Sequence, residues 1–597
     1  MRQHSIKKTA LCAATFAAVF GGAAQAQQGD PLYRYQWHLM NYGQSVLGDT
    51  KPAFGIDLGI DDLHDYNIRG KGVTVAVVDQ GVEIAHPDLA ANVVANGSWN
   101  FSDDSHDPTP TKASQAHGTA VAGIIASVGW NGIGGRGVAP AARLKSFNYL
   151  SVDDATKQPS LEDVWLTRPE LADVQVSNNS WGAYANYLPA AISENEIAAD
   201  ERALSATRGG LGTIYIKSAG NGFSNWSAYA DTGNFNVCGA DALAAGVGCS
   251  QAIWDGQHGK FNVMVIAAAD ASGQRSTYST PGASIWVAGL GGEYGWQRQG
   301  LLNAGYSEAV AGGQAAYLYE PAIVTTDLSG CARGYNNNAA GSGRSVLDSD
   351  RSLLDNTCNY TGSMNGTSAA APTVSGVVAL MLQVNPKLSF RDVKYILATT
   401  ARQIDPNQAQ VRDANGTVIA PGWITNAAGR RFSNWYGFGL VDATLAVTRA
   451  GNFKSLPALR DSGWQRAQLD VPVAIGNAAA PATASVRIAN GPRNIEAVQI
   501  GLDTDYVHAG TWQQAGGATA TPLLVTLRSP GGTRAFVLPA HSAYGGRVLT
   551  IPFSSVNAFL DESSDGDWTV EVADVDRAAG VASAGNLTSF KLRVLGH

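Results

Sequence analysis

The chain alternates short apolar runs with segments of helical periodicity, and this alternation limits the folds open to it. From Gly72 onward the alternating segments are residues 73–78, 120–127, 142–147, 174–177 and 213–217. Strand-length runs with apolar residues on both faces must be buried on both sides. When helices separate such runs, a parallel sheet covered on both faces is expected. The predicted fold class of this part is therefore α/β.

Two polar residues lie just beyond the ends of predicted strands. Asp79 follows the run at 73–78, and Asn221 follows the run at 213–217. Ligands of parallel sheets bind beyond the carboxyl ends of the strands. Both residues are therefore candidates for a functional site.

After about residue 450 the pattern changes. A short connector over 450–461 leads to strand-like segments, such as 523–528 followed by a turn at 529–532, and 567–572. We predict an α/β domain over residues 27–450 and a separate all-β sandwich over 451–597.

The N-terminus has the three parts of a secretory signal peptide. Arg2, Lys7 and Lys8 precede an apolar run over 9–24, and Ala24-Gln25-Ala26 provides a small-residue cleavage site. A membrane anchor is the alternative, but the apolar run is shorter than the roughly 20 residues that span a bilayer. We predict a signal peptide over 1–26 and a secreted or periplasmic bacterial protein without a membrane anchor.

Export bears on the interpretation of the cysteines. Once Cys12 leaves with the signal, an even number remains, which in an oxidising compartment predicts two disulfides. The remaining cysteines are Cys238, Cys249, Cys331 and Cys358. Three pairings are open, and we favour the local one, 238 with 249 and 331 with 358. Zinc is the alternative, but no CxxC motif or nearby His pair supports it.

The charge of the chain excludes one class of partner. The net charge is −8 and no basic run is present. Proteins that bind nucleic acid need a basic patch to neutralise phosphates. We therefore expect no nucleic-acid partner.

Four segments supply the parts of a serine nucleophile site. Such a site needs a nucleophile, a base, a carboxylate that orients the base, and donors for the oxyanion. The candidates are Asp79 at a strand end, His117 at the start of a small-residue helix, Asn221 in an Ala-Gly-Asn-Gly turn, and Ser368 in Asn365-Gly-Thr-Ser. Each has a common structural explanation when taken alone, as a cap, a core histidine or a turn. Together, in this order, they predict a triad with Asn221 as an oxyanion donor.

Ser368 has the strongest local signature of the four. Gly366 permits close approach of a substrate, and a helix predicted over 374–383 follows. A serine at a helix start places its hydroxyl and N–H where an anion is favoured. Pro372 suits a first turn, because it has no N–H to lose there.

With these motifs the chain resembles the subtilase superfamily, and within it the kexin and furin branch. The match runs from Asp30-Pro-Leu to about Val447, and residues 486–595 resemble the P domain of that branch, notably 525–533 and 566–570. The resemblance implies a subtilisin-like domain, a jelly-roll-like P domain, and peptide hydrolysis through an acyl-enzyme on Ser368. A non-catalytic binding or adhesion module that keeps the fold is the alternative, and the intact set of four residues argues against it.

The resemblance also implies calcium. The ligand positions of the family's strongest site correspond to the side chains of Asp30, Asp88 and Asn131 and to the carbonyls of Val128, Ile133 and Gly135. Hard oxygen ligands from distant segments suit Ca²⁺. The alternative is that Asp88 caps a turn and Asp30 is solvated. A second site at Asp103 and Asp107 is a further possibility, although acidic loops are often just solvated.

The resemblance places the substrate beside Ser180, Trp181, Gly182, Ala219 and Gly220, with Asp255 as the acid of the P1 pocket. Several acids of the dibasic-processing members are missing, and the residues in their places are Gln80, Ser114, Ala185, Ser227 and Thr280. These members' second calcium site is therefore expected to be absent. Asp255 predicts cleavage after a single basic residue, although Asp-Gly is also a turn signal.

The family's inhibitory, folding-assisting pro-segment has no counterpart here. Only residues 27–29 separate the signal from the Asp30-Pro-Leu arm. Besides protein or peptide substrates, we therefore expect a separate folding chaperone or inhibitor, or that the P domain takes over this role.

Overall fold

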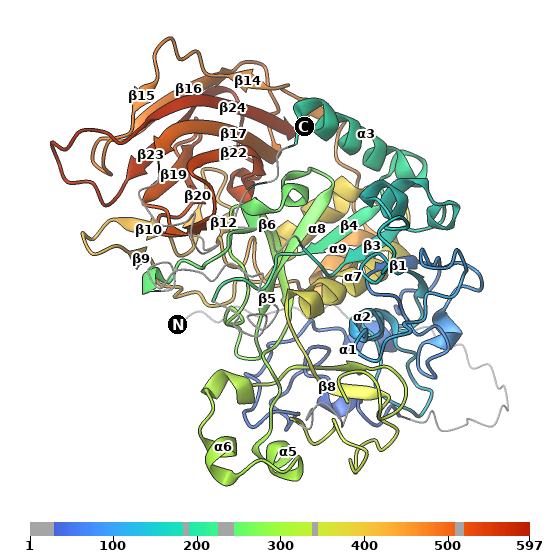
Figure 1. Ribbon diagram of the computed structural model, residues 1–597. Helices are drawn as coiled ribbons and strands as arrows, with labels where there is room; N and C mark the ends of the chain where they lie inside the picture. Colours follow the sequence, from blue (N-terminus) through green and yellow to red (C-terminus); the bar gives the residue numbers. More distant parts are fainter. Residues whose placement is uncertain (1–28, 183–188, 190–191, 225–243, 337–343, 508–518) are drawn as a thin grey trace, which may run out of the picture.

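The computed structural model describes residues 29–182, 189, 192–224, 244–336, 344–507 and 519–597 (Figure 1). At its centre is a six-stranded sheet in the order β2-β1-β3-β4-β5-β6, and every neighbouring pair is parallel. The strands are β1 Thr74–Val78, β2 Arg143–Phe147, β3 Val176–Asn179, β4 Ile214–Ser218, β5 Val263–Ala269 and β6 Ile285–Leu290. The first four coincide with predicted runs.

Alternate residues of β1 pack on opposite faces of this sheet. Val75 and Val77 share a core with α2 His117–Ala126 and α7 Thr367–Val384. Ala76 and Val78 belong to a second core, which includes Leu204 of α3 Glu194–Gly210. Because successive side chains of a strand point to opposite faces, helices cover both faces of the sheet. The predicted α/β fold class is confirmed.

The remaining helices and small strands surround this core. They are α1 Asp61–Asp65, α5 Arg298–Asn303, α6 Glu308–Gly312, α8 Phe390–Thr400, α9 Ala443–Gly451, β7 Ile323–Thr326, β8 Tyr360–Met364, β9 Val411–Arg412, β10 Val418–Ala420, β11 Ile424–Thr425 and β12 Arg431–Phe432. Within the part of the chain that the structure describes, α7 alone is long and apolar enough to cross a membrane, and most of it is buried as a core helix.

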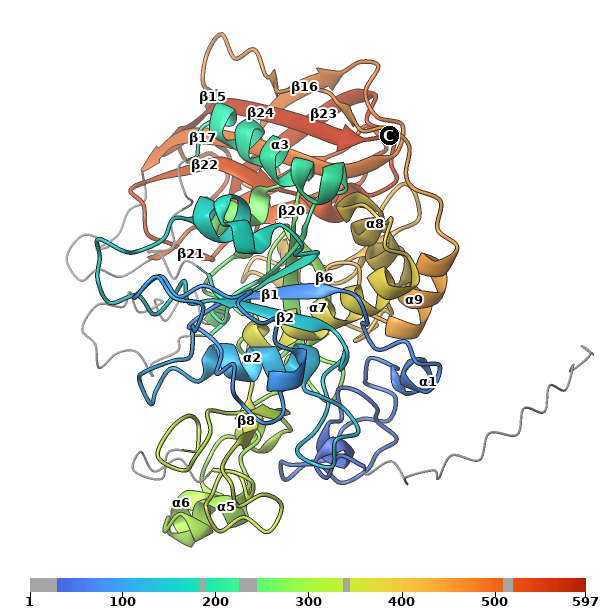
Figure 2. The ribbon, with the colours of Figure 1, turned by 90° about the vertical axis from the view of Figure 1, so that its right-hand side faces the viewer.

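Two larger antiparallel sheets and one two-stranded sheet form the C-terminal domain. Of the larger two, one has the order β13-β24-β17-β22, with β14 and β15 also paired to β24, and the other has the order β16-β23-β19-β20. The strands are β13 Arg460–Asp461, β14 Gln465–Arg466, β15 Val473–Ala474, β16 Ala482–Ile488, β17 Ile495–Val507, β18 Thr519–Ala520, β19 Leu523–Arg528, β20 Arg534–Leu538, β21 Ala543–Tyr544, β22 Val548–Ser555, β23 Gly566–Asp574 and β24 Asn586–Gly596. Figure 2 shows this domain on one side of the central strands and α5 and α6 on the other.

Buried polar contacts join the two domains. Arg593 of β24 donates to the carboxylate of Glu201 in α3 at 2.8 Å, and Gln499 donates to the same carboxylate at 2.6 Å. Arg391 of α8 forms a bidentate ion pair with the carboxylate of Glu496, at 2.6 and 2.8 Å. Bidentate and buried charged contacts of this kind fix geometry more firmly than exposed ones.

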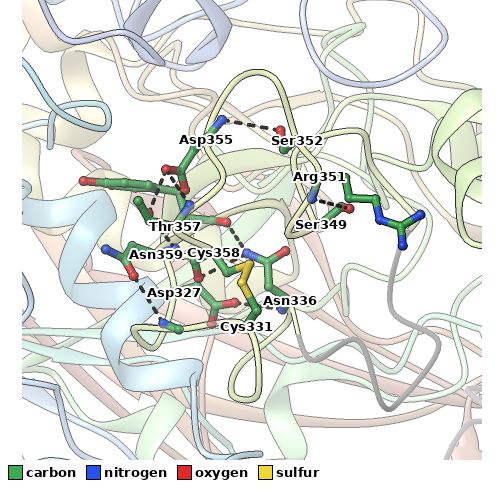
Figure 3. Close-up of a disulfide and its surroundings, with 12 residues drawn as sticks. Asp327, Cys331, Asn336, Ser349, Arg351, Ser352, Asp355, Thr357, Cys358 and Asn359 are labelled. Atoms are coloured by element: carbon green, nitrogen blue, oxygen red, sulfur yellow. Dashed lines mark hydrogen bonds between the residues drawn. A yellow bond between two sulfur atoms is a disulfide. The ribbon is translucent and has the colours of Figure 1, made fainter.

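A disulfide joins Cys331 to Cys358 (Figure 3), as the local pairing predicts. It closes the loop between β7 and β8, and β8 leads directly into the segment that carries Ser368. Inside the loop, the carboxylate of Asp327 accepts a hydrogen bond from the N–H of Asn336 at 2.9 Å. Cys249 is disulfide-bonded as well, and its predicted partner, Cys238, lies outside the described residues.

Candidate active site

Asp79 and His117 form a hydrogen-bonded pair at the end of β1. Asp79 is fully buried, and its two carboxylate oxygens lie 2.8 and 2.9 Å from Nδ1 of His117. A carboxylate only accepts, so Nδ1 carries the proton and Nε2 is left as the base. Burial alone would lower the pKa of His117, but the Asp79 carboxylate outweighs it and the pKa is raised.

Gly118 allows this close approach. A Cβ at this position would lie 2.1 Å from the carbonyl oxygen of Gly81 and 3.2 Å from Cβ of Asp79. Any larger residue would push the start of α2 away from the strand end. The His-Gly pair therefore sets the geometry of the base.

Ser368 lies in the first turn of α7, reached through Gly366 with φ of 93°. Its hydroxyl donates to the carbonyl of Ser180 at 3.0 Å, and the Ser180 hydroxyl donates to the Ser368 carbonyl at 2.9 Å. Next to Ser180, the indole N–H of Trp181 donates to the carbonyl of Val78 at 2.9 Å. The segment 180–181 thus connects Ser368 to the residue before Asp79.

Asn221 is held by Thr367, the residue before Ser368. The side-chain oxygen of Asn221 accepts from both the N–H and the hydroxyl of Thr367, at 2.9 Å each. The hydroxyl of Thr367 accepts in turn from the N–H of Gly220 at 3.1 Å. With Oδ1 fixed, the side-chain NH₂ is free to donate elsewhere. The N–H of Ser368 is also available, because the first helical N–H groups have no acceptor within their helix.

The predicted P1 pocket, defined here by residues 180–182, 219–220 and 255, contains an ion pair. Nζ of Lys217 lies 3.1 Å from a carboxylate oxygen of Asp255. A Cβ on Gly182 would lie 3.5 Å from that oxygen and 3.8 Å from Nζ, so the pair lies directly below Gly182. Asp255 also begins a short helix as its cap, accepting from the N–H of Gln257 at 2.9 Å.

Two of the residues that stand where the dibasic-processing members have acids form hydrogen bonds to backbone N–H groups. The Gln80 side chain accepts from the N–H of His117 at 3.4 Å, and Thr280 accepts from the N–H of Gly222 at 2.8 Å. Ser114 is exposed. Ala185 and Ser227 lie outside the described residues.

The predicted calcium ligands come together around Asp88. The Asn131 side chain donates to Oδ1 of Asp88 at 2.7 Å, and the N–H of Asn131 donates to Asp30 at 3.2 Å. The N–H of Val128 donates to the Asp88 carbonyl at 2.9 Å. The loop 128–135 also carries the other two predicted carbonyl ligands, of Ile133 and Gly135.

Oδ2 of Asp88 is a buried oxygen without a hydrogen-bond partner among the described residues. Burial raises the pKa of Asp88 to about 8, although the Asn131 hydrogen bond opposes the rise. An orphaned carboxylate oxygen beside a second carboxylate fits a cation. Asp30 also pairs with Nε of Arg136 at 2.8 Å, a contact that the sequence did not predict.

Asp103 and Asp107 cap their own turns. Asp103 accepts from the N–H of Ser105 at 3.1 Å, and Asp107 accepts from the N–H of Thr109 at 3.0 Å. The part of the chain that the structure describes has no group of three or more His, Cys, Asp or Glu side chains that could hold a metal ion. The second metal site stays a sequence prediction without structural support.

Comparison with protein families identifies the family of this chain. The model of the Subtilase family matches residues 70–439, which is more than half of the chain. The chain belongs to the subtilase family. The model of the Proprotein convertase P-domain matches residues 518–594, so this subtilase carries a P domain, as the resemblance implies.

Named relatives of this subtilase are bacterial and eukaryotic proteases. It is 35% identical to the "Aeromonas extracellular serine protease" of Aeromonas sobria, over 95% of this chain and 91% of that protein. It is 32% identical to the "Microbial serine proteinase" of Aeromonas salmonicida, over 91% and 84% of the two chains. Rat furin is more distant, at 27% identity over 95% of this chain and 58% of furin. These relatives support the predicted enzyme class, a serine protease.

A solved structure extends the likeness to three dimensions. The crystal structure of the Aeromonas sobria serine protease with a chaperone superimposes with a TM-score of 0.80 and 33% identity, covering 96% of this chain and 95% of that one. The subtilisin-like fold with a β-rich P domain is therefore confirmed.

The sequence did not predict three residues of this subtilase that contact candidate site residues. Thr367 could have been recognised, because it precedes Ser368 within the Gly-Thr-Ser motif. Lys217 and Arg136 could not, because each acts through an ion pair with a residue from a distant segment.

Proposed function

We propose that this subtilase is an exported, calcium-dependent serine endopeptidase with Asp79, His117 and Ser368 as its triad. The buried Asp79–His117 pair carries the proposal, because it sets the histidine tautomer that a serine nucleophile requires. Asn221, fixed by Thr367, serves as an oxyanion donor. Protein and peptide chains are the substrates.

In the proposed reaction the Ser368 hydroxyl first rotates away from the Ser180 carbonyl towards Nε2 of His117. Nε2 takes its proton as Oγ attacks the peptide carbonyl, and the imidazolium is stabilised by Asp79. The side-chain NH₂ of Asn221 and the N–H of Ser368 bind the oxyanion. His117 returns the proton to the leaving amine, and a water molecule then hydrolyses the acyl-enzyme.

Internal cleavage of a denatured protein tests this function. The purified chain should cut denatured casein into peptides with new internal termini, read by mass spectrometry. A chain that binds casein without producing new termini would support the adhesion module and contradict the proposal. Chymotrypsin-digested casein on the same instrument serves as the positive control.

Export and a helper protein complete the proposal. Residues 1–26 lie outside the described residues, so export is supported by their signal-like sequence and by a relative named as extracellular. A related protease has been crystallised with a chaperone. We infer that a separate chaperone assists folding here too.

Calcium is proposed to tie the N-terminal arm to the core through Asp30, Asp88 and Asn131. Their oxygens would hold the ion, and its charge would remove the cost of the buried Asp88 carboxylate. The ion has a structural role, so no catalytic step depends on it directly.

Calcium should raise the stability of the protein. A site that is lost on unfolding adds about 2.7 kcal/mol to the free energy of unfolding at a free Ca²⁺ concentration of 100 Kd. Thermal unfolding in EDTA and in millimolar Ca²⁺ measures the difference. Asp88→Asn should abolish the calcium response, whereas Asp154→Asn, a matched change in an exposed turn, should retain it. An equal melting temperature of the wild type with chelator and with calcium would contradict the site.

A further inference from the structure

Lys217 is a fully buried lysine near the end of strand β4, just before the candidate site. Its side chain has no exposed surface, and Nζ lies 3.1 Å from Asp255. Nζ also donates to the carbonyl of Trp181 and lies 4.2 Å from the centre of the Trp181 ring. A buried ammonium needs such partners, because an unpaired one would be strongly destabilising. Lys217 is therefore a fixed part of the structure and not a solvated side chain.

The Lys217–Asp255 pair lies beside residues that the sequence predicts for the P1 pocket. Lys217 is followed within four residues by Asn221, the proposed oxyanion donor. On the opposite side, Ser180 contacts Ser368, and a Cβ on Gly182 would lie within 4 Å of both charged groups. In the predicted P1 pocket, a substrate side chain between these two segments would approach the ion pair.

The charges of this pair cancel. Burial would raise the pKa of Asp255, but Lys217 and then His258 outweigh burial and lower it, so Asp255 is ionised. Nε2 of His258 lies 3.6 Å from Asp255, and burial lowers the pKa of this histidine, so it is neutral near pH 7. Tyr149, beside Trp181, has a pKa raised by burial and then by Asp255, and it is neutral too. Burial lowers the pKa of Lys217, and the Asp255 carboxylate 3.1 Å away opposes this, so one anion and one cation face each other.

We propose that Lys217 is a specificity-determining residue, which neutralises Asp255 and makes the P1 pocket favour uncharged side chains over Arg and Lys. A basic P1 side chain would have to share Asp255 with an ammonium already bound to it, and like charges placed together repel each other. This inference rests on the proposed peptidase function. It replaces the sequence-based expectation of a basic P1 residue, which treated Asp255 as unpaired.

Peptides that differ only at P1 test the proposal. With Leu, Phe, Arg and Lys at P1, the wild type should show a kcat/KM at least about tenfold higher for the better of Leu and Phe than for Arg. Lys217→Met, which keeps the length of the side chain and removes its charge, should shift the Arg-to-Leu ratio by about tenfold or more towards Arg. Lys217→Arg, which keeps the charge, should retain the wild-type order.

One further measurement keeps the outcomes distinct. The rate of Ser368 acylation by a small uncharged reagent reports a folded active site independently of P1, and it qualifies each variant before its ratio is used. If Lys217→Met does not fold, the wild-type ratio still decides. A wild type that cleaves after Arg at least tenfold faster than after Leu or Phe overturns the inference and leaves the peptidase function intact. Absence of both acylation and cleavage would overturn the peptidase function itself.

Discussion

Replacing Ser368 with alanine is expected to lower kcat for peptide hydrolysis by about 10⁶-fold while the protein stays folded. The variant has no nucleophile, so the Asp79–His117 pair has nothing to activate. The substitution removes the Ser368 hydroxyl, so the Ser180 carbonyl loses one hydrogen-bond donor. This loss costs about 1 kcal/mol of stability. Three alanines follow Ser368 in α7, so the helix accepts a fourth. Hydrolysis of a fluorogenic peptide and thermal unfolding measure the two effects.

Asn221→Ala provides the graded comparison for this prediction. Loss of one oxyanion donor should lower kcat by about 10²–10³ and leave KM nearly unchanged. Asn221→Asp keeps the oxygen that accepts from Thr367 but has no NH₂, so it separates the donor role from the positioning contact. A Ser368→Ala protein that turns over peptide at the wild-type rate would exclude Ser368 as the nucleophile.

Removing the P domain is expected to leave no stable catalytic domain. Residues 27–450 alone would retain Glu201 without its partner Arg593, and they would lose the amide of Asn557, which donates to the carbonyls of Ser284 and Ile285 at 2.8 and 3.1 Å. The Trp254–Tyr544 ring contact would also be lost. Breaking one buried charged pair by itself costs about 3–5 kcal/mol, a large part of the stability of a domain.

The comparison requires matched expression. The full chain and the 27–450 fragment are expressed with the same helper proteins, and soluble yield and peptidase activity are measured for both. Adding residues 451–597 as a separate chain should restore activity if the interface contacts act as we infer. A soluble, fully active 27–450 fragment without any helper would contradict the role of the P domain.

Local chemistry made much of the site predictable. Asp79, His117 and Ser368 each lie in a motif whose small neighbours are needed for close packing, as the 2.1 Å approach at Gly118 shows. The strands β5 and β6 were not predicted, although both begin with residues that favour a strand. The alanines at the end of β5 lack such a preference, and tertiary packing places them.

Long-range pairing made the rest unpredictable. Lys217 ends an apolar run, a position that usually indicates a solvated side chain, and its burial depends on Asp255 from a later segment. The sequence therefore placed Asp255 in the pocket but could not show that its charge was already matched. The same limit applies to Arg136, whose pairing with Asp30 follows only from the folded loop.

Covalent labelling with a fluorophosphonate tests the central claim, that Ser368 is an activated nucleophile. The folded full-length protein should form one adduct, located on Ser368 by peptide mass spectrometry. Labelling should be absent in Ser368→Ala and strongly slowed in His117→Ala, because Nε2 supplies the base. No adduct on the folded wild type, or an adduct elsewhere that persists undiminished in Ser368→Ala, would contradict the account.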